Sequence, residues 1–217
     1  MKRPLLVLIN GAAPGLGKSS LAIGLARRWK DEGVVVEFLE EPEILERQEF
    51  AALVAEWHRT GSVASTTLLD AARSYLDSCR ESEATVFVID SLLPFLPSLL
   101  AWGLSDEEVI EFLVSLSHLM QGFEVLQVQL EGDAGAALIR AAEREGNDWL
   151  DRFVKKVGAY QDEGGLTADQ AGIVAYLESA TARTRALLAA APWPVRFVSV
   201  DRGPDLTMAE VWRLLEG

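Results

Sequence analysis

A glycine-rich loop between an apolar run and a helical pattern constrains this chain more than any other stretch. Residues 5–9 have the length and apolarity of a buried strand, and residues 20–29 have the pattern of a helix. Between them, residues 10–19 read Asn-Gly-Ala-Ala-Pro-Gly-Leu-Gly-Lys-Ser. A strand, a glycine-rich loop ending in Gly-Lys-Ser and a helix form the phosphate-binding loop, or P-loop. The first glycine position of the motif holds Ala12, with Gly11 just before it.

The chemistry of phosphate binding explains the residue types in this loop. Gly15 and Gly17 allow backbone amides to turn inward and approach a phosphate closely. The helix that follows contributes its N-terminal amides and its dipole. Lys18 is predicted to reach the β- and γ-phosphates of ATP, and the Ser19 hydroxyl to hold Mg²⁺. The residues predicted to bind the nucleotide are Ala13, Pro14, Gly15, Leu16, Gly17, Lys18, Ser19 and Ser20.

Composition limits the partners of such a loop. The chain has 217 residues and 49% of them are hydrophobic, which suits one α/β domain with a helical lid. The net charge of -13 argues against general binding to nucleic acid or to an anionic membrane. The one cysteine, Cys79, excludes an internal disulfide and fits a reducing compartment, so we expect a cytoplasmic protein. No stretch is long and apolar enough to span a membrane.

The third predicted strand ends in a carboxylate. Residues 84–91 read Ala-Thr-Val-Phe-Val-Ile-Asp-Ser, and the four apolar residues before Asp90 match the Walker B pattern. A carboxylate in this position holds Mg²⁺ directly or through water. Together with the P-loop, the pattern predicts Ser19 and Asp90 as the residues that hold the metal.

The second predicted strand, residues 34–39, also leads into acidic residues, Glu40 and Glu41, followed by Pro42. Ligands of open α/β sheets bind at the carboxyl ends of the strands, so Glu41 is a candidate site residue. An acid at the start of a helix is also favoured by the helix dipole, which explains Glu41 equally well. The helix in question is predicted over residues 43–59.

Two arginines on one helix face are open to two interpretations. Arg140 and Arg144 are four residues apart in a helix predicted over residues 133–144, and Arg152 follows after a short segment. Arginines in this place could clamp the phosphates during transfer, or could form a solvated face with nearby glutamates.

Two further features are equally open. Arg73, in a helix predicted over residues 64–80, faces either an anionic ligand or the solvent. Residues 92–103 are very apolar and follow the strand that carries Asp90. This segment either lines a substrate pocket, or belongs to the core or to an interface with a second copy of the chain, as in a homodimer.

The rest of the chain continues to alternate strands with helices. Further strands are predicted over residues 123–130 and 194–200, and further helices over residues 105–121, 151–161, 168–190 and 207–215. The first of these helices opens with a capping-box pattern, Ser105 to Glu108. The alternation predicts a P-loop NTPase fold: a single-domain, three-layer α/β sandwich with a five-stranded parallel sheet between helices. The helical lid is predicted at about residues 138–155.

The order of these motifs resembles the thymidylate kinase and deoxynucleoside kinase group of P-loop kinases. Residues 38–42, Phe-Leu-Glu-Glu-Pro, look like the Glu-Pro motif of that group. The resemblance implies that Glu41 acts as general base on a substrate hydroxyl and that Arg73 approaches the substrate. It also implies that Arg140, Arg144 and Arg152 contact the donor phosphates from the lid. One departure stands out, because Asp90 is followed by Ser91 where the group carries an arginine.

The features together favour an ATP-dependent phosphotransferase that moves the γ-phosphoryl group of Mg-ATP to a small acceptor. The resemblance points to a nucleoside or nucleotide acceptor, although the missing arginine weakens that assignment. The predicted catalytic residues are Lys18, Glu41, Asp90, Arg140 and Arg144. The alternative is an ATP-binding regulator or ATPase that acts through the apolar segment as a partner surface, or a related protein that binds nucleotide without chemistry.

Overall fold

A parallel sheet forms the centre of the computed structural model, which describes residues 3–159 and 170–216. The sheet has five strands in the order β2-β3-β1-β4-β5. In chain order they are β1 (Leu5–Asn10), β2 (Val36–Leu39), β3 (Val86–Asp90), β4 (Glu124–Glu131) and β5 (Val195–Ser199). All neighbouring strands pair in parallel, so the predicted sheet is confirmed.

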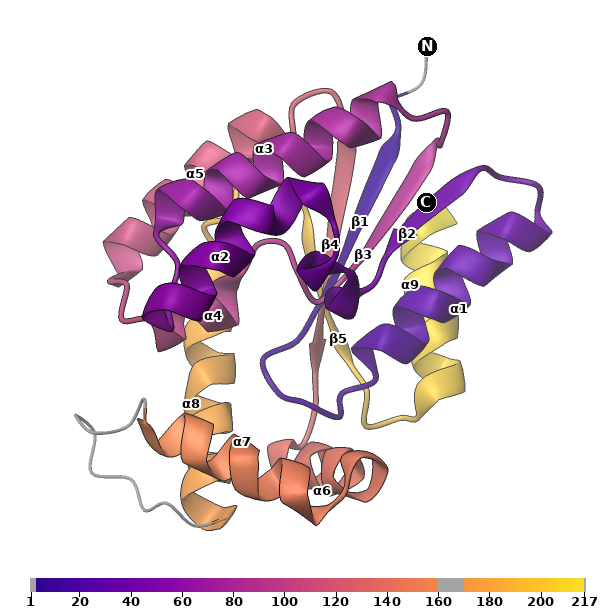
Figure 1. Ribbon diagram of the computed structural model, residues 1–217. Coiled ribbons are helices and arrows are strands. Elements are labelled where there is room, and N and C mark those ends of the chain that lie inside the picture. The colour runs from indigo at the N-terminus through magenta and orange to yellow at the C-terminus, as the bar shows by residue number, and fades with distance from the viewer. Residues whose placement is uncertain (1–2, 160–169, 217) are drawn as a thin grey trace.

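Helices cover both faces of the sheet, which gives the predicted three layers (Figure 1). One face carries α2 (Ala51–Thr60), α3 (Ser65–Glu81), α4 (Leu96–Ala101) and α5 (Asp106–Leu119). The other face carries α1 (Lys18–Asp31) and α9 (Pro204–Glu216). There Trp29 of α1 packs on Trp212 of α9, with their ring centroids 5.2 Å apart.

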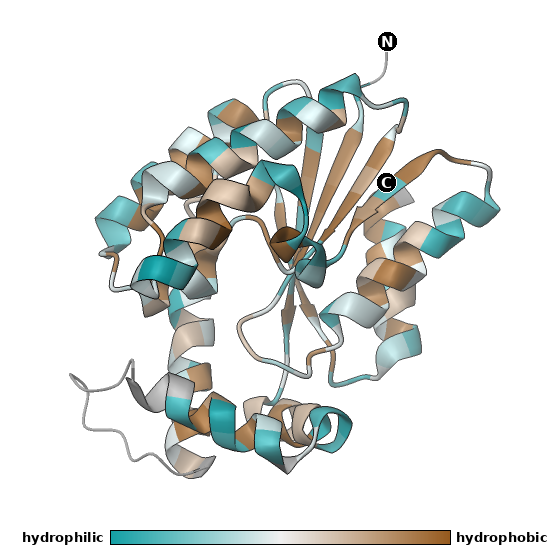
Figure 2. Ribbon diagram, viewed as in Figure 1, coloured by the Kyte–Doolittle hydropathy of each residue, from teal (hydrophilic) through white to brown (hydrophobic). Residues whose placement is uncertain are grey.

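Strand β1 belongs to both cores because its side chains alternate between the two faces of the sheet. Leu6 and Leu8 are fully buried in the core under α3 and α5, and Val7 and Ile9 are fully buried in the core under α1. Apolar residues dominate the strands, while polar residues gather on the outer helix surfaces (Figure 2). The central strand is therefore fixed from both sides at the point where the P-loop leaves it.

Three helices gather beyond the carboxyl ends of the strands, next to the P-loop (Figure 1). They are α6 (Ala134–Glu145), α7 (Asn147–Ala159) and α8 (Gln170–Leu188). Helix α8 reaches both cores, with Ile173 and Leu177 in one and Leu187 and Leu188 in the other. The predicted break at residues 162–165 lies outside the described residues.

The prediction of a single helix over residues 43–59 is wrong. Its place is taken by two short 3-10 helices, η1 (Glu41–Leu45) and η2 (Gln48–Phe50), followed by α2. Pro42 lies in the first turn of η1, and Arg47 then adopts an extended backbone with φ −80° and ψ 137°, which no helix can contain. The interruption has a physical cause, because the Arg47 side chain pairs with acids on both sides of it.

Other parts of the chain also differ from the prediction, and helix α9, for example, begins at Pro204 rather than at residue 207. Helix α7 begins at Asn147 rather than residue 151, since Gly146, with φ +89°, ends α6 and the next helix starts at once. The apolar segment 92–103 contains the unpredicted helix α4, which begins after Phe95 and has Pro97 in its first turn.

Candidate functional site

The carboxyl ends of β1 and β3 meet at the base of the P-loop. Asp90, the last residue of β3, is in register with Ile9 of β1, and its side chain is 2% exposed. The Ser91 hydroxyl donates a hydrogen bond of 2.7 Å to one carboxylate oxygen of Asp90. The Ser91 backbone amide donates to the Ile9 carbonyl at 2.8 Å, which fixes the turn. The predicted metal residue therefore lies directly beside the loop.

The P-loop has the backbone that its glycines predict. Gly15 and Gly17 have φ of +77° and +82°, and α1 begins at Lys18, immediately after the second of them. The Lys18 ammonium donates a hydrogen bond of 2.9 Å to the carbonyl of Ala13. The lysine is thus attached to the loop, in the first turn of the helix whose N-terminal amide groups can bind a phosphate.

Electrostatics connect Lys18 to three other predicted residues. Burial lowers the pKa of Lys18, while the carboxylates of Glu41 and Asp90 raise it and the guanidinium of Arg144 lowers it. Charges act on a pKa in this way only when they lie near the titrating group. Charged groups from η1, the end of β3 and helix α6 therefore act electrostatically on the same ammonium.

A cleft of about 740 Å³ opens at this point. Its volume lies in the range typical of small-molecule sites. The predicted site residues that line it are Pro14, Gly15, Gly17, Lys18, Ser19, Ser20, Glu41 and Arg144.

The other predicted residues lie outside the described lining of the cleft. Ala13, Leu16 and Asp90 are buried behind it. Arg140 is exposed, and its Nε donates to the carbonyl of Gly15 at 3.2 Å. Arg73 is exposed on α3, and Arg152 is exposed on α7.

Helix α6 rests directly on the P-loop. A Cβ atom placed on Gly15 would lie 1.9 Å from the carbonyl oxygen of Ala137, a distance that no two such atoms can share. Gly15 therefore has a second requirement besides its positive φ, because only a residue without a side chain lets α6 approach. Together with the hydrogen bond from Arg140, this contact joins the predicted lid helix to the loop.

The apolar segment after β3 lines the cleft and also enters the core. Leu93, Leu96 and Leu99 are at most 1% exposed, whereas Phe95 and Trp102 lie among the lining residues. The Asn10 side-chain amide donates to the carbonyl of Leu93 at 2.6 Å, so the segment is attached to the start of the P-loop.

Aromatic side chains on distant helices complete the cleft, and sequence reasoning missed them. Trp57 comes from α2, Trp149 and Phe153 from α7, and Tyr176 from α8. Trp149 and Phe153 stack with their centroids 5.1 Å apart and their planes 7° from parallel. Their four-residue spacing marks one face of α7, which was the available signal. The pattern does not say whether such a face meets the core or a ligand.

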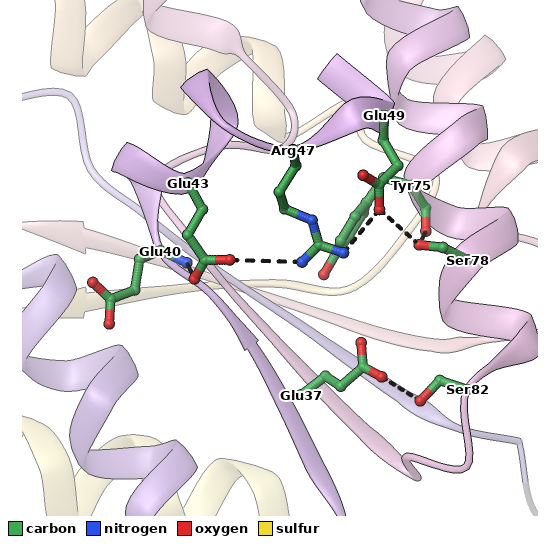
Figure 3. A network of polar contacts seen from close by, with 8 residues as sticks. All are labelled: Glu37, Glu40, Glu43, Arg47, Glu49, Tyr75, Ser78 and Ser82. Carbon is green, nitrogen blue, oxygen red and sulfur yellow. Dashed lines mark hydrogen bonds and ion pairs between the residues drawn. The ribbon is translucent and has the colours of Figure 1, made fainter. Parts of the chain in front are cut away.

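A polar network supports the chain just after Glu41 (Figure 3). Arg47 lies between Glu43 and Glu49, at 3.7 Å and 2.8 Å respectively, and over the ring of Tyr75 at 5.2 Å. The Ser78 hydroxyl donates to the same Glu49 oxygen at 3.3 Å. The hydrogen bond from Arg47 lowers the pKa of Glu49 below its ordinary value. This Arg47 network ties η1, which begins at Glu41, to helix α3.

Comparison with known proteins identifies the fold. By sequence, no protein-family model and no curated protein matches the chain. By structure, it is similar to the YorR protein of Bacillus subtilis, crystallised in complex with phosphorylated GDP, at 14% identity and a TM-score of 0.55. That alignment covers 98% of this chain and 95% of the other.

A second solved structure gives the same result. The thymidylate kinase of Ehrlichia chaffeensis aligns at 9% identity with a TM-score of 0.53, covering 98% of both chains. The fold is therefore that of the thymidylate kinase-like P-loop kinases, as the sequence motifs predicted. At sequence identities this low, structural similarity defines the fold but not the reaction, which depends on the residues of the site.

Two further properties of the described residues limit other kinds of site. Within residues 3–159 and 170–216, no helix has both the length and the apolarity needed to cross a bilayer. The same part of the chain holds no cluster of three or more His, Cys, Asp or Glu side chains arranged for a metal. A magnesium ion bound with phosphates does not require such a cluster, since it keeps most of its water and phosphate ligands.

Proposed function

We propose that the chain is a phosphotransferase that moves the γ-phosphoryl group of Mg-ATP to a hydroxyl group of a small acceptor. The observation that carries the proposal is a P-loop cleft lined by Lys18, Glu41 and Arg144, with Asp90 buried behind it at the end of β3. The YorR protein, which shares this fold, was crystallised with phosphorylated GDP, and this supports a nucleotide as the ligand. The P-loop amides and Lys18 would hold the donor phosphates.

The donor residues fit a magnesium ion bound with the nucleotide. The Ser19 hydroxyl is exposed at the first turn of α1, and the Asp90 carboxylate keeps one oxygen outside its bond with Ser91. Oxygen donors of this kind are those that Mg²⁺ takes in phosphate-binding sites. When bound, Mg²⁺ would neutralise charge on the phosphate oxygens.

Transfer then needs one acceptor group and one base. The acceptor oxygen forms a bond to the γ-phosphorus, and the bond from that phosphorus to the β–γ bridging oxygen breaks, so that ADP leaves with the electron pair. Glu41 lies on the cleft wall, where it would orient the hydroxyl group and take its proton for release to solvent. Lys18 and Arg144 would stabilise the charge on the phosphoryl group during transfer.

A second candidate function is nucleotide binding without transfer, as in a regulator or an ATPase that acts on a partner. Ser91, in the position where the resembling kinases carry an arginine, favours it. The burial of Leu93, Leu96 and Leu99 speaks against the apolar segment as a partner surface. The two candidates differ in whether ADP release depends on an acceptor.

The test is a screen for acceptor-dependent ADP release across nucleosides, nucleoside monophosphates and other hydroxyl compounds. Glu41→Gln should keep nucleotide affinity in calorimetry and lose about 10²–10⁴-fold in transfer rate, because it removes the base. Glu46→Gln, an exposed acid just after η1, serves as the matched control and should transfer normally. Lys18→Ala should lower nucleotide affinity or turnover by about 10²-fold or more. ADP release that is independent of every acceptor would favour the regulator or ATPase.

A further inference from the structure

The segment that carries Glu41 has little apolar anchorage of its own. Leu39, the last residue of β2, is fully buried, but within the described residues of η1 (Glu41–Leu45) none is buried. Leu45 is 57% exposed, and Ile44 is only partly buried where it packs against the core. A segment with few buried apolar contacts opens locally at low cost in free energy. The placement of Glu41 on the wall of the cleft therefore depends on polar contacts as well.

Glu43 joins the start of η1 to Arg47 (Figure 3). One of its carboxylate oxygens accepts a hydrogen bond of 3.2 Å from the backbone amide of Glu40, the residue before Glu41. The other carboxylate oxygen lies 3.7 Å from Nη1 of Arg47. The Glu43 amide in turn donates to the Glu40 carbonyl at 3.0 Å. One carboxylate thus contacts both the backbone next to Glu41 and the arginine.

The far side of Arg47 is attached to the core. Its Nη2 lies 2.8 Å from a carboxylate oxygen of Glu49, and the Ser78 hydroxyl of α3 donates to the same oxygen at 3.3 Å. The guanidinium lies over the Tyr75 ring, 5.2 Å from its centroid. Tyr75 is 1% exposed and stacks on the fully buried Phe50, with their ring centroids 5.8 Å apart. Arg47 therefore connects an exposed segment to side chains that packing holds in place.

The charge and shape of Arg47 suit this connection. The hydrogen bond between Arg47 and Glu49 raises the pKa of the arginine and lowers the pKa of the glutamate, so both stay charged at neutral pH. The planar guanidinium offers separate nitrogens to carboxylates on two sides, Nη1 to Glu43 and Nη2 to Glu49. A lysine ammonium has one nitrogen and cannot span both. Arg47 itself lies outside the described lining of the cleft, so its effect on a reaction there is indirect.

We propose that Arg47 is a positioning residue that acts through Glu43 to keep the Glu41 carboxylate on the cleft wall. The proposal rests on the proposed phosphotransferase function, in which Glu41 orients the acceptor hydroxyl and takes its proton. A base contributes fully only in the right geometry, and a displacement of about 1 Å can cost about 10²-fold in rate. Loss of Arg47 should therefore slow transfer while the P-loop continues to bind nucleotide.

A double-mutant cycle tests the proposal, because a residue that acts through Glu41 has nothing to position once that carboxylate is gone. Transfer from Mg-ATP is measured for Arg47→Met, Glu41→Gln and the double variant with the acceptors of the screen above, thymidine and thymidine monophosphate included. Arg47→Met should lower kcat about tenfold and leave KM for ATP unchanged. In the Glu41→Gln background it should cause no further loss. A further loss of similar size there, or a wild-type kcat in Arg47→Met alone, would overturn the proposal.

Two matched variants separate positioning from the loss of a charge in general. Arg47→Lys keeps the charge but spans only one of the two carboxylates, so kcat should fall by less than in Arg47→Met. Arg59→Met, which removes an exposed arginine from the last turn of α2, should leave kcat unchanged in both backgrounds. An equal loss of kcat in Arg59→Met and Arg47→Met would contradict a specific role for Arg47.

Hydrogen exchange gives a readout that needs no acceptor. In Arg47→Met the backbone amide of Glu43, which donates to the Glu40 carbonyl, should exchange faster. The acceleration should exceed that of amides in the interior of α1, which report any loss of global stability. Equal acceleration in η1 and α1 would overturn the proposal and leave the phosphotransferase standing. A wild-type transfer rate in Glu41→Gln would instead remove the base, and with it both the proposed mechanism and the role of Arg47.

Discussion

The two ends of the cleft are built in different ways. The donor end uses backbone amides and short side chains from one continuous stretch, the P-loop and the first turn of α1. The rest of the cleft, the proposed acceptor end, uses large side chains from α2, from the two residues that flank α4, and from α7 and α8, which are far apart in the sequence. Phosphate is a common ligand that a local backbone shape can bind, whereas a particular acceptor needs a surface assembled from several elements.

Gly15→Ala gives the largest expected effect and tests whether the donor end depends on α6. An alanine at this position would be strained by the left-handed backbone conformation. Its Cβ would also collide with the Ala137 carbonyl oxygen, so α6 would have to move. Gly33→Ala is a matched control, since Gly33 has a similar φ of +79° with nothing within 4 Å of the added Cβ. The control should lose about 1–2 kcal/mol in urea unfolding, and Gly15→Ala several kcal/mol. Similar losses in the two variants would contradict the packing of α6 on the loop.

Arg144→Ala tests the cation that helix α6 contributes to the lining of the cleft. Removing it should lower kcat about tenfold to hundredfold, because a charge beside the transferring group is lost, with a smaller change in nucleotide affinity. Arg196→Ala, an exposed arginine on β5, is the control and should leave both unchanged. Rapid-quench measurement of transfer and calorimetry of nucleotide binding separate the two quantities. A loss in nucleotide affinity with an unchanged kcat would assign Arg144 to binding alone.

Arg47→Met tests the network that supports the acceptor end. The variant should lose about 1–2 kcal/mol of stability at neutral pH, since Glu49 and Glu43 lose their charged partner. The lowered pKa of Glu49 sets the pH dependence: its stabilisation is present above the unfolded pKa and disappears as pH falls through the folded pKa. The wild type and the variant should therefore converge in acid.

Urea unfolding from neutral to acidic pH measures this convergence. Arg59→Met, which removes an exposed arginine from the last turn of α2, should track the wild type throughout. A difference between Arg47→Met and the wild type that stays constant with pH would rule out the Glu49 pairing as its source.

Cys79 reports on helix α3, behind the proposed acceptor end, without any substitution. Burial raises the pKa of the Cys79 thiol to about 12. At pH 8 about 10⁻⁴ of the thiol is then ionised, so iodoacetamide should label it far more slowly than a free cysteine peptide. Labelling should reach the peptide rate in denaturant. Fast labelling of the native protein would mean that the α3 layer opens, and the acceptor wall would not be preformed.

The donor end was predictable because its signals are local in the chain. Strand β1, which leads into the P-loop, pairs with β3 so that Ile9 lies beside Asp90, as the motifs indicated. The capping box predicted at Ser105 is also present, with hydrogen bonds of 2.8 and 3.2 Å to and from Glu108. Each of these features depends on a few neighbouring residues and on the geometry of parallel strands.

The acceptor end was not predictable because its causes are distant in the chain. Arg47 interrupts the predicted helix through contacts that include Tyr75 on α3. Trp57 and Tyr176 line the same cleft only in the folded protein. Single-sequence patterns show that a helix face is apolar, but they do not show which surface covers it.

The distribution of tryptophan has a practical consequence for anyone who works with this protein. The chain has 6 tryptophans, and Trp57, Trp102 and Trp149 line the cleft. The others, Trp29, Trp193 and Trp212, lie in the interior at 8%, 7% and 5% exposure. Intrinsic fluorescence therefore comes from two populations, one that a solute such as acrylamide reaches through the cleft and one that it does not. A filled cleft should shield the first population and leave the second as an internal standard.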